Sequence, residues 1–418
     1  MLLINSNTCS FAKIYPISLD YLASILKDND YKVDTLDLAF ISPAEALKII
    51  REKIRLKQYL AIGVGIRNLN DEQLGGKNYL PEIIDFIRNI KKLTDKTKIK
   101  IILGGPGFSL MSRTILDETK ADYGIIGEGE KAFVTLLNGL SEHKMPEQDL
   151  LFDAADIVNI SYKRGSWGNF HGYFRNHASG NLQTKRGCPM NCLYCEYPVI
   201  EGRNFRLRKP EITAGEFLQL EKLGFPRIYI VDATFNNPLY HAKEVLQAFK
   251  KAGTKKPWTG FLNPKFIDRE LIDLIRQTNG EIPIKITIES GSDKILRNLN
   301  KNFSKEDIEK TVRLCRKNKI DFSFTVLFGS PGENRGTVRE TCKLIKESKP
   351  SHVSMSIGVF IHPKTPIAAK TYKKLWHFET DFINPIIYPC NRDKIKNWIK
   401  EELSDTGIDY SLYEGGEG

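Results

Sequence analysis

The first 140 residues alternate short apolar runs with amphipathic stretches that follow the period of an α-helix. This alternation predicts parallel strands joined by crossover helices. The predicted strands are 2–5, 32–38, 60–66, 100–103 and 123–126, and the predicted helices are 18–27, 43–55, 81–93, 109–118 and 131–140. Such repeats indicate a doubly wound, Rossmann-like α/β domain over residues 1–142, whose ligands would bind at the carboxyl ends of the strands.

The periodicity disappears between residues 143 and 180, where glycines and aromatic residues are frequent, and we interpret this segment as a linker. A second alternation follows. Its predicted strands are 182–185, 227–231, 258–262, 284–288, 322–327 and 353–360, and its predicted helices are 214–223, 239–251, 266–277, 293–298, 305–317 and 337–347. These repeats predict a partial (β/α)6 barrel over residues 181–365 with its chemistry at the strands' carboxyl ends. Residues 366–418 are expected to form a small C-terminal extension with one helix at 392–403.

Composition places the chain among ordinary globular proteins, with 41% apolar and 27% charged residues in 418. No apolar run is long enough to cross a membrane, and the apolar start is too short for a signal peptide, so we expect a cytoplasmic protein without a membrane partner. The net charge of +11 favours anionic ligands. Most lysines lie along amphipathic stretches, however, which is the pattern of solvated helix faces.

Three of the seven cysteines are clustered, and the chain shows no export signal, so a disulfide framework is not expected. They occur in Lys185-Arg-Gly-Cys-Pro-Met-Asn-Cys-Leu-Tyr-Cys-Glu, directly after the first predicted barrel strand. Thiolates of Cys188, Cys192 and Cys195 can bind three irons of a 4Fe-4S cluster and leave the fourth iron open. A zinc site is the alternative, but it usually takes paired cysteines or added histidines, and the nearest histidine, His177, lies upstream.

This loop resembles the signature of the radical SAM superfamily, in which an aromatic residue, here Tyr194, precedes the last cysteine. Strand ends resembling those of that superfamily read Asp232-Ala-Thr-Phe-Asn, Ile288-Glu-Ser-Gly-Ser and Phe328-Gly-Ser-Pro-Gly-Glu. The resemblance implies that S-adenosylmethionine binds the open iron and is cleaved to a 5'-deoxyadenosyl radical. The residues that it assigns to this cofactor are Asp232, Glu289, Ser290, Gly329 and Pro331. The usual Gly-Gly-Glu stretch is replaced by residues 232–236, which leaves the contact to the methionine amino group open.

A doubly wound domain ahead of such a barrel resembles the cobalamin-dependent subclass of this superfamily. The matching segments are Leu103-Gly-Gly-Pro-Gly and Gly124-Ile-Ile-Gly-Glu-Gly-Glu. Glycines at strand ends let a bulky corrin approach the backbone, where side chains would collide with it. The residues that this resemblance assigns to cobalamin are Asn5, Arg67, Gly104, Gly105, Pro106, Gly127, Glu128 and Gly129.

Arg67 is also a candidate catalytic residue. No histidine occurs before His143, so this domain cannot supply a histidine as the lower cobalt ligand. The third strand ends Gly63-Val-Gly-Ile-Arg-Asn, which resembles members that hold cobalamin with an unligated lower face beside an arginine. A guanidinium has no lone pair for a metal. We therefore hypothesise that Arg67 keeps water from cobalt and favours methyl donation; the alternative is a sheet-end arginine that pairs with Asp71.

The resemblance implies a cobalamin-dependent radical SAM methyltransferase. Such an enzyme transfers a methyl group from S-adenosylmethionine, via methylcobalamin, to an unactivated carbon or phosphorus of a small molecule or peptide, with an external electron donor such as flavodoxin or ferredoxin. A ring rearrangement or cyclisation without methylation, an RNA-modifying enzyme and a non-catalytic corrinoid carrier are the alternatives. The related methylthiotransferases carry three further cysteines in their first domain, whereas this chain has only Cys9 there, so nucleic acid is not an expected partner. We interpret His352 and His362 as ordinary polar residues, with substrate contact as the alternative.

Overall fold

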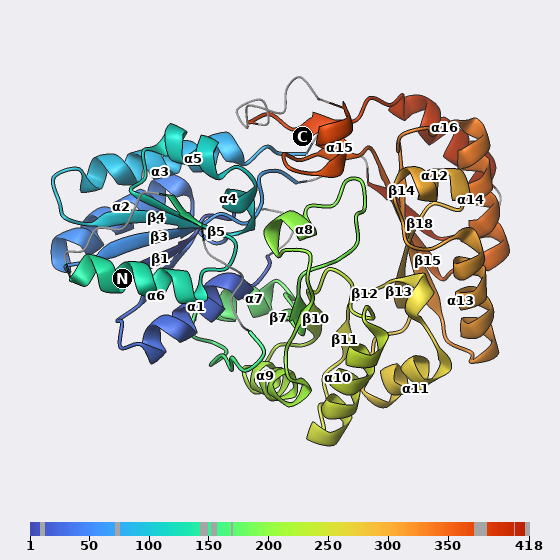
Figure 1. Cartoon of the computed structure of the whole chain (residues 1–418), viewed down its shortest axis with the longest axis horizontal. Helices are drawn as coiled ribbons and strands as arrows, with labels where there is room; N and C mark the ends of the chain where they lie inside the picture. Colours follow the sequence, from blue (N-terminus) through green and yellow to red (C-terminus); the bar gives the residue numbers. More distant parts are fainter. Residues whose placement is uncertain are drawn as a thin grey trace.

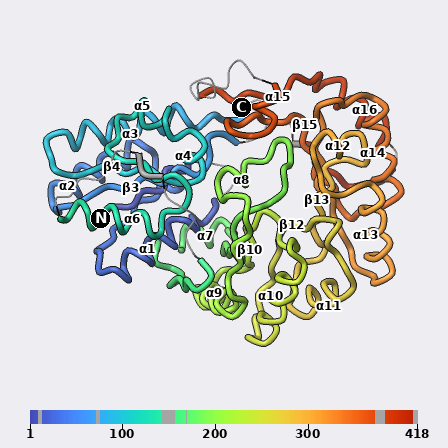
Figure 2. Tube along the Cα trace, in the orientation of Figure 1, coloured from blue at the N-terminus to red at the C-terminus, as the bar shows by residue number. Residues whose placement is uncertain are grey.

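The computed structural model describes residues 1–8, 13–71, 76–142, 149–151, 157–168, 170–371, 383–404 and 406–413. An N-terminal sheet flanked by helices lies beside a larger barrel-like half, and the short helix α8 (Tyr197–Ile200) sits between them (Figure 1; the chain trace is in Figure 2). Cys9 lies outside the described residues, as do 143–148, 152–156 and 169 of the predicted linker. The same holds for 372–382, 405 and 414–418 of the predicted C-terminal extension.

The N-terminal sheet is parallel, with its strands in the order β2-β1-β3-β4-β5-β6. The strands are β1 (Leu2–Asn5), β2 (Asp34–Asp37), β3 (Ala61–Gly65), β4 (Lys100–Gly104), β5 (Tyr123–Ile126) and β6 (Asp149–Leu151). The strand order reverses between β1 and β3. Doubly wound sheets bind their ligands at the carboxyl edge of such a switch point.

Helices cover both faces of this sheet, as a buried parallel sheet requires. Helices α1 (Ile17–Asp28) and α6 (Glu130–Ser141) contact each other and pack on the face that carries Leu3 and Ile125. Helices α2 (Pro43–Leu56), α3 (Leu80–Thr94) and α5 (Ser112–Thr119) pack on the face that carries Leu2 and Ile4. The short helix α4 (Pro106–Leu110) follows β4 directly.

The segment between the halves is part of the core rather than a simple connection. Its β6 extends the N-terminal sheet, and helix α7 (Phe170–Arg175) follows the described stretch 157–168. The side chains of Tyr162, Trp167 and Tyr173 are at most 1% exposed. Tyr162 stacks on Tyr21 of α1, with ring centroids 3.6 Å apart. From the sequence we interpreted the aromatic residues of this segment as part of a linker. In the structure they join the two halves because they bury apolar surface between them.

Buried charged side chains also meet at this junction. Arg164 donates through Nε to the Asp20 carboxylate of α1 at 2.8 Å, and its Nη1 lies 3.6 Å from Glu216 of α9 (Pro210–Lys222). These three side chains are fully buried. The backbone N–H groups of Gly165 and Trp167 also donate to Asp20. Helix α1, the connecting segment and the first barrel helix are thus fixed to one another through one carboxylate and one guanidinium.

The barrel half contains two parallel sheets in the orders β11-β10-β7 and β12-β13-β14-β15-β18. The strands are β7 (Gly180–Leu182), β10 (Ile228–Ile230), β11 (Trp258–Thr259), β12 (Phe261–Leu262), β13 (Ile284–Glu289), β14 (Phe322–Phe328), β15 (His352–Ile357) and β18 (Tyr410–Tyr413). Two small antiparallel pairs complete it: β8 (Lys185–Arg186) with β9 (Arg206–Leu207), and β16 (Phe360–Ile361) with β17 (Ile386–Ile387).

Helices cover the outer face of the barrel sheets. They are α9, α10 (Leu239–Ala252), η1 (Pro264–Phe266), α11 (Arg269–Gln277), α12 (Asp293–Asn298), α13 (Lys305–Lys317), α14 (Arg335–Ser348) and α16 (Arg392–Leu403). Helix α15 (Pro366–Thr371) instead packs against the segment that follows β8, where the Ile367 N–H donates to the Leu193 carbonyl at 2.8 Å. In β14 the residues alternate between buried and half-buried. The buried ones, such as Phe324 and Val326, join the apolar core, so the half-buried ones face the barrel interior.

The predicted α/β class, a doubly wound domain followed by a partial barrel, is confirmed. Several elements differ from the prediction. The helix predicted at 109–118 is two helices, because Pro106 starts α4 earlier and Met111 leaves the helical conformation between α4 and α5. The strand predicted at 258–262 is divided at Gly260 into β11 and β12. The C-terminal extension supplies β18 to the barrel sheet, although the sequence indicated only its helix.

Candidate functional site

The three clustered cysteines occupy the loop between β8 and α8. All three are free thiols; Cys188 and Cys192 are buried, and Cys195 is half-buried. Burial raises the pKa of Cys188, and it raises the pKa of Cys195 to about 12, with a further contribution from the neighbouring thiol of Cys192. Bare thiolates are therefore disfavoured in this loop, and positive iron ions would offset that cost. The donor set fits a cluster of the predicted kind.

Close backbone packing shapes the start of this loop. Gly187 has a φ of +85°, and a Cβ atom there would overlap the carbonyl oxygen of Asn204. The N–H of Cys188 donates to the Gly202 carbonyl at 3.0 Å. Among the described residues no three Cys, His, Asp or Glu side chains form a group that could hold a metal ion. A 4Fe-4S cluster does not need such convergence, because each thiolate binds its own iron.

Tyr194 fastens the loop to the end of β13. Its hydroxyl donates to the Glu289 carboxylate at 2.8 Å, and Lys301 Nζ donates to the same oxygen at 3.0 Å. Although burial favours its neutral form, the charge of Glu289 raises the pKa of Lys301 above its ordinary value. Glu289 has a φ of +58°, and the register of β13 against β14 shifts at this point. Such a strained bulge redirects the chain at the end of the strand.

Asp232 follows β10 and contacts the strand that precedes the cysteine loop. It accepts hydrogen bonds from the backbone N–H of Thr184 at 2.8 Å and from Lys185 Nζ at 2.8 Å, in an ion pair that is almost fully buried. Lys185 Nζ also donates to the Phe235 carbonyl at 2.8 Å. The predicted cofactor contact of Asp232 stays a prediction, and its observed bonds hold β8, the strand before Cys188, in place.

The predicted S-adenosylmethionine residues after β13 and β14 form two adjoining turns along α14. The Ser290 hydroxyl lies 2.9 Å from that of Thr341, and Glu333 accepts a hydrogen bond from the Thr337 hydroxyl at 2.6 Å. Gly329 packs against Gly358, and the Pro331 carbonyl accepts a bond from Asn298 at 2.7 Å.

Several buried polar atoms in these turns have no hydrogen-bond partner among the described residues: Ser292 Oγ, Ser330 Oγ and Glu333 Oε2. Burial raises the pKa of Glu333 to about 7, despite hydrogen bonds from Thr337 and the backbone that lower it. Native proteins seldom leave such atoms unsatisfied, so the turns fit a polar ligand such as a nucleoside. Ser292 and Ser330 lie in the two strand-end segments quoted from the sequence, but they were not among the residues assigned to S-adenosylmethionine, because no local pattern marks a buried hydroxyl as unpaired.

At the carboxyl edge of the N-terminal sheet, two glycine-rich loops differ in what surrounds them. Gly105 has a φ of +101°, and a Cβ atom there would lie 2.5 Å from the Ile66 carbonyl oxygen. At Gly127 and Gly129 a Cβ atom would meet nothing within 4 Å. Close packing against the Ile66 carbonyl accounts for the glycine at 105, and its contact with cobalamin stays a prediction. The open space lies at the loop after β5, and this loop fits a bulky ligand.

The other residues assigned to cobalamin lie at the same edge. Gly104 ends β4, where a Cβ atom would make ordinary contact with Ile125, and Pro106 is the first residue of α4. Asn5 donates to the Asp37 carboxylate at 2.9 Å, and Asp37 also accepts from Trp167 and Tyr173, so Asn5 belongs to a buried network. Arg67 follows β3, is half-buried, and its positive charge acts on the Tyr173 hydroxyl.

The loop after β5 meets the cysteine loop through charged side chains. Arg186 Nη2 donates to Glu130 at 2.6 Å, and Arg186 Nη1 lies 3.1 Å from Glu128. Arg206 also pairs with Glu128. The carboxylate of Glu128, which the sequence assigned to cobalamin, is thus in contact with the barrel half. The edges predicted for the two cofactors therefore lie next to each other.

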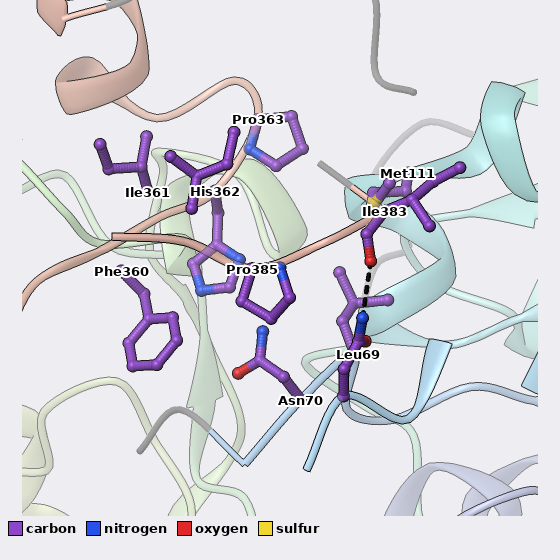
Figure 3. A pocket seen from close by; sticks show the side chains of 11 residues that line it. Leu69, Asn70, Met111, Phe360, Ile361, His362, Pro363, Ile383 and Pro385 are labelled. Atoms are coloured by element: carbon purple, nitrogen blue, oxygen red, sulfur yellow. Dashed lines mark hydrogen bonds between the residues drawn. The ribbon is translucent and has the colours of Figure 1, made fainter. Parts of the chain in front are cut away.

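A small hollow lies between the N-terminal half and the β16–β17 pair (Figure 3). Its walls include Leu69, Asn70, Met111 and Phe360. His362 also lines it, with Nε2 3.7 Å from Glu196, the residue after Cys195. His352 instead contacts Asp409 and Ser411 beside β18. Of the two histidines, only His362 lies beside the cysteine loop.

Comparison with known families agrees with this geometry. Residues 182–345 match the model of the radical SAM superfamily, and residues 7–137 match that of the B12 binding domain. The chain is a radical SAM protein with a B12-binding domain. The predicted family is confirmed, and with it the three predicted cofactors: a 4Fe-4S cluster, S-adenosylmethionine and cobalamin.

Relatives of this radical SAM protein include the tryptophan 2-C-methyltransferase of Streptomyces laurentii, which is 22% identical over 88% of this chain and 73% of the relative. The cytidylyl-2-hydroxyethylphosphonate methyltransferase of Streptomyces wedmorensis is 24% identical over 69% of this chain. The match spans 63% of that relative's length.

Solved structures share the fold. The radical S-adenosylmethionine methyltransferase TsrM from Kitasatospora setae, with cobalamin and a [4Fe-4S] cluster bound, superposes with a TM-score of 0.78 at 23% identity. The match covers 89% of this chain and 77% of TsrM. The cobalamin-dependent enzyme OxsB reaches a TM-score of 0.69 at 15% identity, over 91% of this chain and 55% of OxsB. No helix in the described part of this radical SAM protein is long and apolar enough to span a membrane.

Proposed function

We propose that the chain is a cobalamin-dependent radical SAM methyltransferase that moves a methyl group from S-adenosylmethionine to an unactivated carbon, or phosphorus, of a small molecule or peptide. The contact between the two cofactor edges carries this proposal. Arg186, two residues before Cys188, pairs with Glu128, which lies between Gly127 and Gly129 in the loop after β5, and with Glu130, the first residue of α6. Methyl transfer between cofactors requires them to be adjacent. The methyltransferase relatives support the same class.

The cysteine loop would hold the cluster through Cys188, Cys192 and Cys195, and the bound cluster supplies an electron and an open iron site. Tyr194 and Lys301 keep this loop against β13 through Glu289. The unpartnered Ser292 and Ser330 hydroxyls can donate to or accept from a nucleoside, and the Glu333 carboxyl can bind one of its hydroxyl or amino groups. The adjoining turns thus orient the cosubstrate at the mouth of the barrel.

Arg67 is proposed to act on the cobalamin side. It follows β3 at the switch-point edge, and its guanidinium stays charged and cannot ligate a metal. Asp71, the alternative partner, accepts from the Lys77 N–H and from the Tyr79 hydroxyl. We expect Arg67→Ala to change the absorbance spectrum of bound cobalamin and to lower turnover. An unchanged spectrum and rate would remove Arg67 from this role.

Anaerobic loading tests the proposed function. The protein is reconstituted with iron, sulfide and hydroxocobalamin, and iron, sulfide and cobalt are counted per chain. We expect about four irons and one corrinoid per chain, and transfer of a labelled methyl group from S-adenosylmethionine to cobalamin under reducing conditions. The variant Cys188→Ala should lose the cluster and retain cobalamin. A wild-type protein that binds neither group contradicts the proposal.

Product mass separates methyl transfer from the alternatives. A methyltransferase adds one CH2 unit to its substrate, whereas a rearrangement or cyclisation does not. The proposal also includes a cytoplasmic location and an external one-electron donor of the flavodoxin or ferredoxin class. Methyl transfer at equal rates with and without such a donor, in the absence of a chemical reductant, would contradict the electron-donor part.

A further inference from the structure

Four charged side chains join the chain after β5 to the β8–β9 pair, whose two strands flank the cysteine loop. This bridging cluster consists of Glu128, Glu130, Arg186 and Arg206. Arg186 Nη2 donates to Glu130 at 2.6 Å and Arg186 Nη1 lies 3.1 Å from Glu128, while Arg206 pairs with the other oxygen of Glu128. The Arg206 side chain is 16% exposed, and the other three are 8–9% exposed.

The backbone makes this arrangement rigid. Arg186 and Arg206 are direct partners in the antiparallel β8–β9 pair, so their guanidinium groups face the same loop. Arg186 Nε donates to Gln183 at 2.8 Å, and Tyr162 donates to Glu130 at 3.0 Å. Arg186 is thereby held by a residue of the barrel half, and Glu130 by a residue of the connecting segment.

Arg186 and Glu130 form a charged pair within the bridge. Although burial favours the protonated form, the guanidinium of Arg186 lowers the pKa of Glu130 below its ordinary value. Arginine does not lose its proton in proteins. Buried ion pairs contribute little net stability in general because desolvation offsets their attraction, but the hydrogen bond from Arg186 Nη2 to Glu130 gives the bridge a defined arrangement.

Each end of the bridge lies within a few residues of a predicted cofactor site. Glu128 lies between Gly127 and Gly129, beside the open space predicted for cobalamin, and Arg186 lies two residues before Cys188. We infer that Arg186 and Glu128 are positioning residues that set the separation between cobalamin and the iron–sulfur cluster. This inference rests on the proposed function. It replaces the cofactor contact that the sequence assigned to Glu128 with a contact to the barrel.

Magnetic resonance tests the inference without a substrate. Wild-type protein and the variants Arg186→Lys and Glu128→Gln are loaded with both cofactors, and the dipolar interaction between the reduced cluster and Co(II) cobalamin is measured. We expect one narrow distance distribution in the wild type and a shifted or broadened one in both variants. Cofactor loading and the separate spectrum of each cofactor should stay unchanged. Labelled methyl transfer to cobalamin should slow about 10- to 100-fold.

Control variants separate positioning from general stability. Arg339→Ala removes an exposed pair with Glu402 on the outside of the barrel and should keep the wild-type distance distribution. If Arg186→Lys does not fold, Glu128→Gln and Arg206→Lys carry the same comparison.

Three results would overturn the inference. The first is a wild-type distance distribution in Arg186→Lys and Glu128→Gln. The second is loss of cobalamin from Glu128→Gln while the distribution in the remaining loaded protein is unchanged, which would return Glu128 to the cofactor contact predicted from the sequence. The third is a wild-type protein that takes up neither cofactor. This result would contradict the proposed function itself, and it would be detected before any variant is measured.

Discussion

Lys301 compensates the charge of Glu289 in a place where water reaches neither group freely. Their side chains are 9% and 10% exposed, and the Lys301 ammonium lies 5.4 Å from the ring centre of Tyr194. Removal of the ammonium would leave a buried carboxylate on a strained residue directly beside the cysteine loop.

We therefore expect Lys301→Met to lower the free energy of unfolding by about 3–5 kcal/mol. Urea titration of the cofactor-free protein measures this change. Lys310→Met, which removes an exposed pair with Glu306, serves as the control and should change stability by less than about 0.5 kcal/mol. Equal changes in the free energy of unfolding for the two substitutions would show that the buried Lys301–Glu289 pair matters no more to stability than an exposed pair.

Glu333 gives the cofactor-free protein a definite pH dependence. Burial raises its pKa to about 7 from an ordinary value of 4.5, so the folded protein holds this proton more tightly than the unfolded chain. The contribution of Glu333 to stability is therefore undiminished below pH 4.5, declines between 4.5 and 7, and stays reduced above that range.

Relative to the wild type, Glu333→Gln should be about equally stable at pH 4.5 and progressively more stable as the pH rises to 7. Unfolding midpoints across this range test the prediction. Glu347→Gln, at an exposed pair with Lys343, should show no such gain. A stability difference for Glu333→Gln that does not vary with pH would contradict the raised pKa.

A Gly-x-Gly sequence follows both β4 and β5, but Gly105 and Gly129 have different surroundings. Gly105→Ala combines a positive φ with a contact on the Ile66 carbonyl, and we expect a loss of about 2–3 kcal/mol. Gly129→Ala meets no neighbour within 4 Å and should change stability by less than about 0.5 kcal/mol.

Cobalamin binding should be more sensitive to Gly129→Ala than to Gly105→Ala, which is the reverse of their effects on stability. Gly129→Ala places a methyl group in the open space beside the loop after β5, so we expect the dissociation constant for hydroxocobalamin to rise several-fold. Equilibrium dialysis of the folded variants measures it. Unchanged affinity in Gly129→Ala would exclude this loop as the corrin site.

The sequence predicted those elements whose signals are local. The three clustered cysteines lie in one loop as expected, and the strand–helix alternation is present in the structure, although the elements predicted at 109–118 and 258–262 are each divided. Strand β6 was missed because it has only three residues, and β18 because its pairing with β15 depends on a distant segment. The contacts of Arg186 with Glu128 and Glu130 could not be predicted, because side chains far apart in sequence carry no local sign of pairing.

At the scale of the whole molecule, one set of buried apolar side chains runs through both halves. It includes Leu22 of α1, Tyr173 of the connecting segment, Phe225 after α9 and Ile286 of β13. Because the halves share this core, neither can lose its packing without exposing apolar surface of the other.

We expect calorimetry of the cofactor-free protein to show one cooperative unfolding transition. Trp167→Ala, which truncates a fully buried side chain of the connecting segment, should broaden or split it. Two resolved transitions in the wild type would contradict the shared core.

The salt link among Asp20, Arg164 and Glu216 limits how this protein can be recombined. Three segments contribute to it, one from the first helix, one from the stretch between the halves and one from the first barrel helix. A chimera that joined only the N-terminal domain to another barrel would leave the Asp20 carboxylate buried without its Arg164 partner. Exchange of corrin-binding modules among related enzymes would therefore have to transfer the connecting stretch and the facing surface of α9 as one unit.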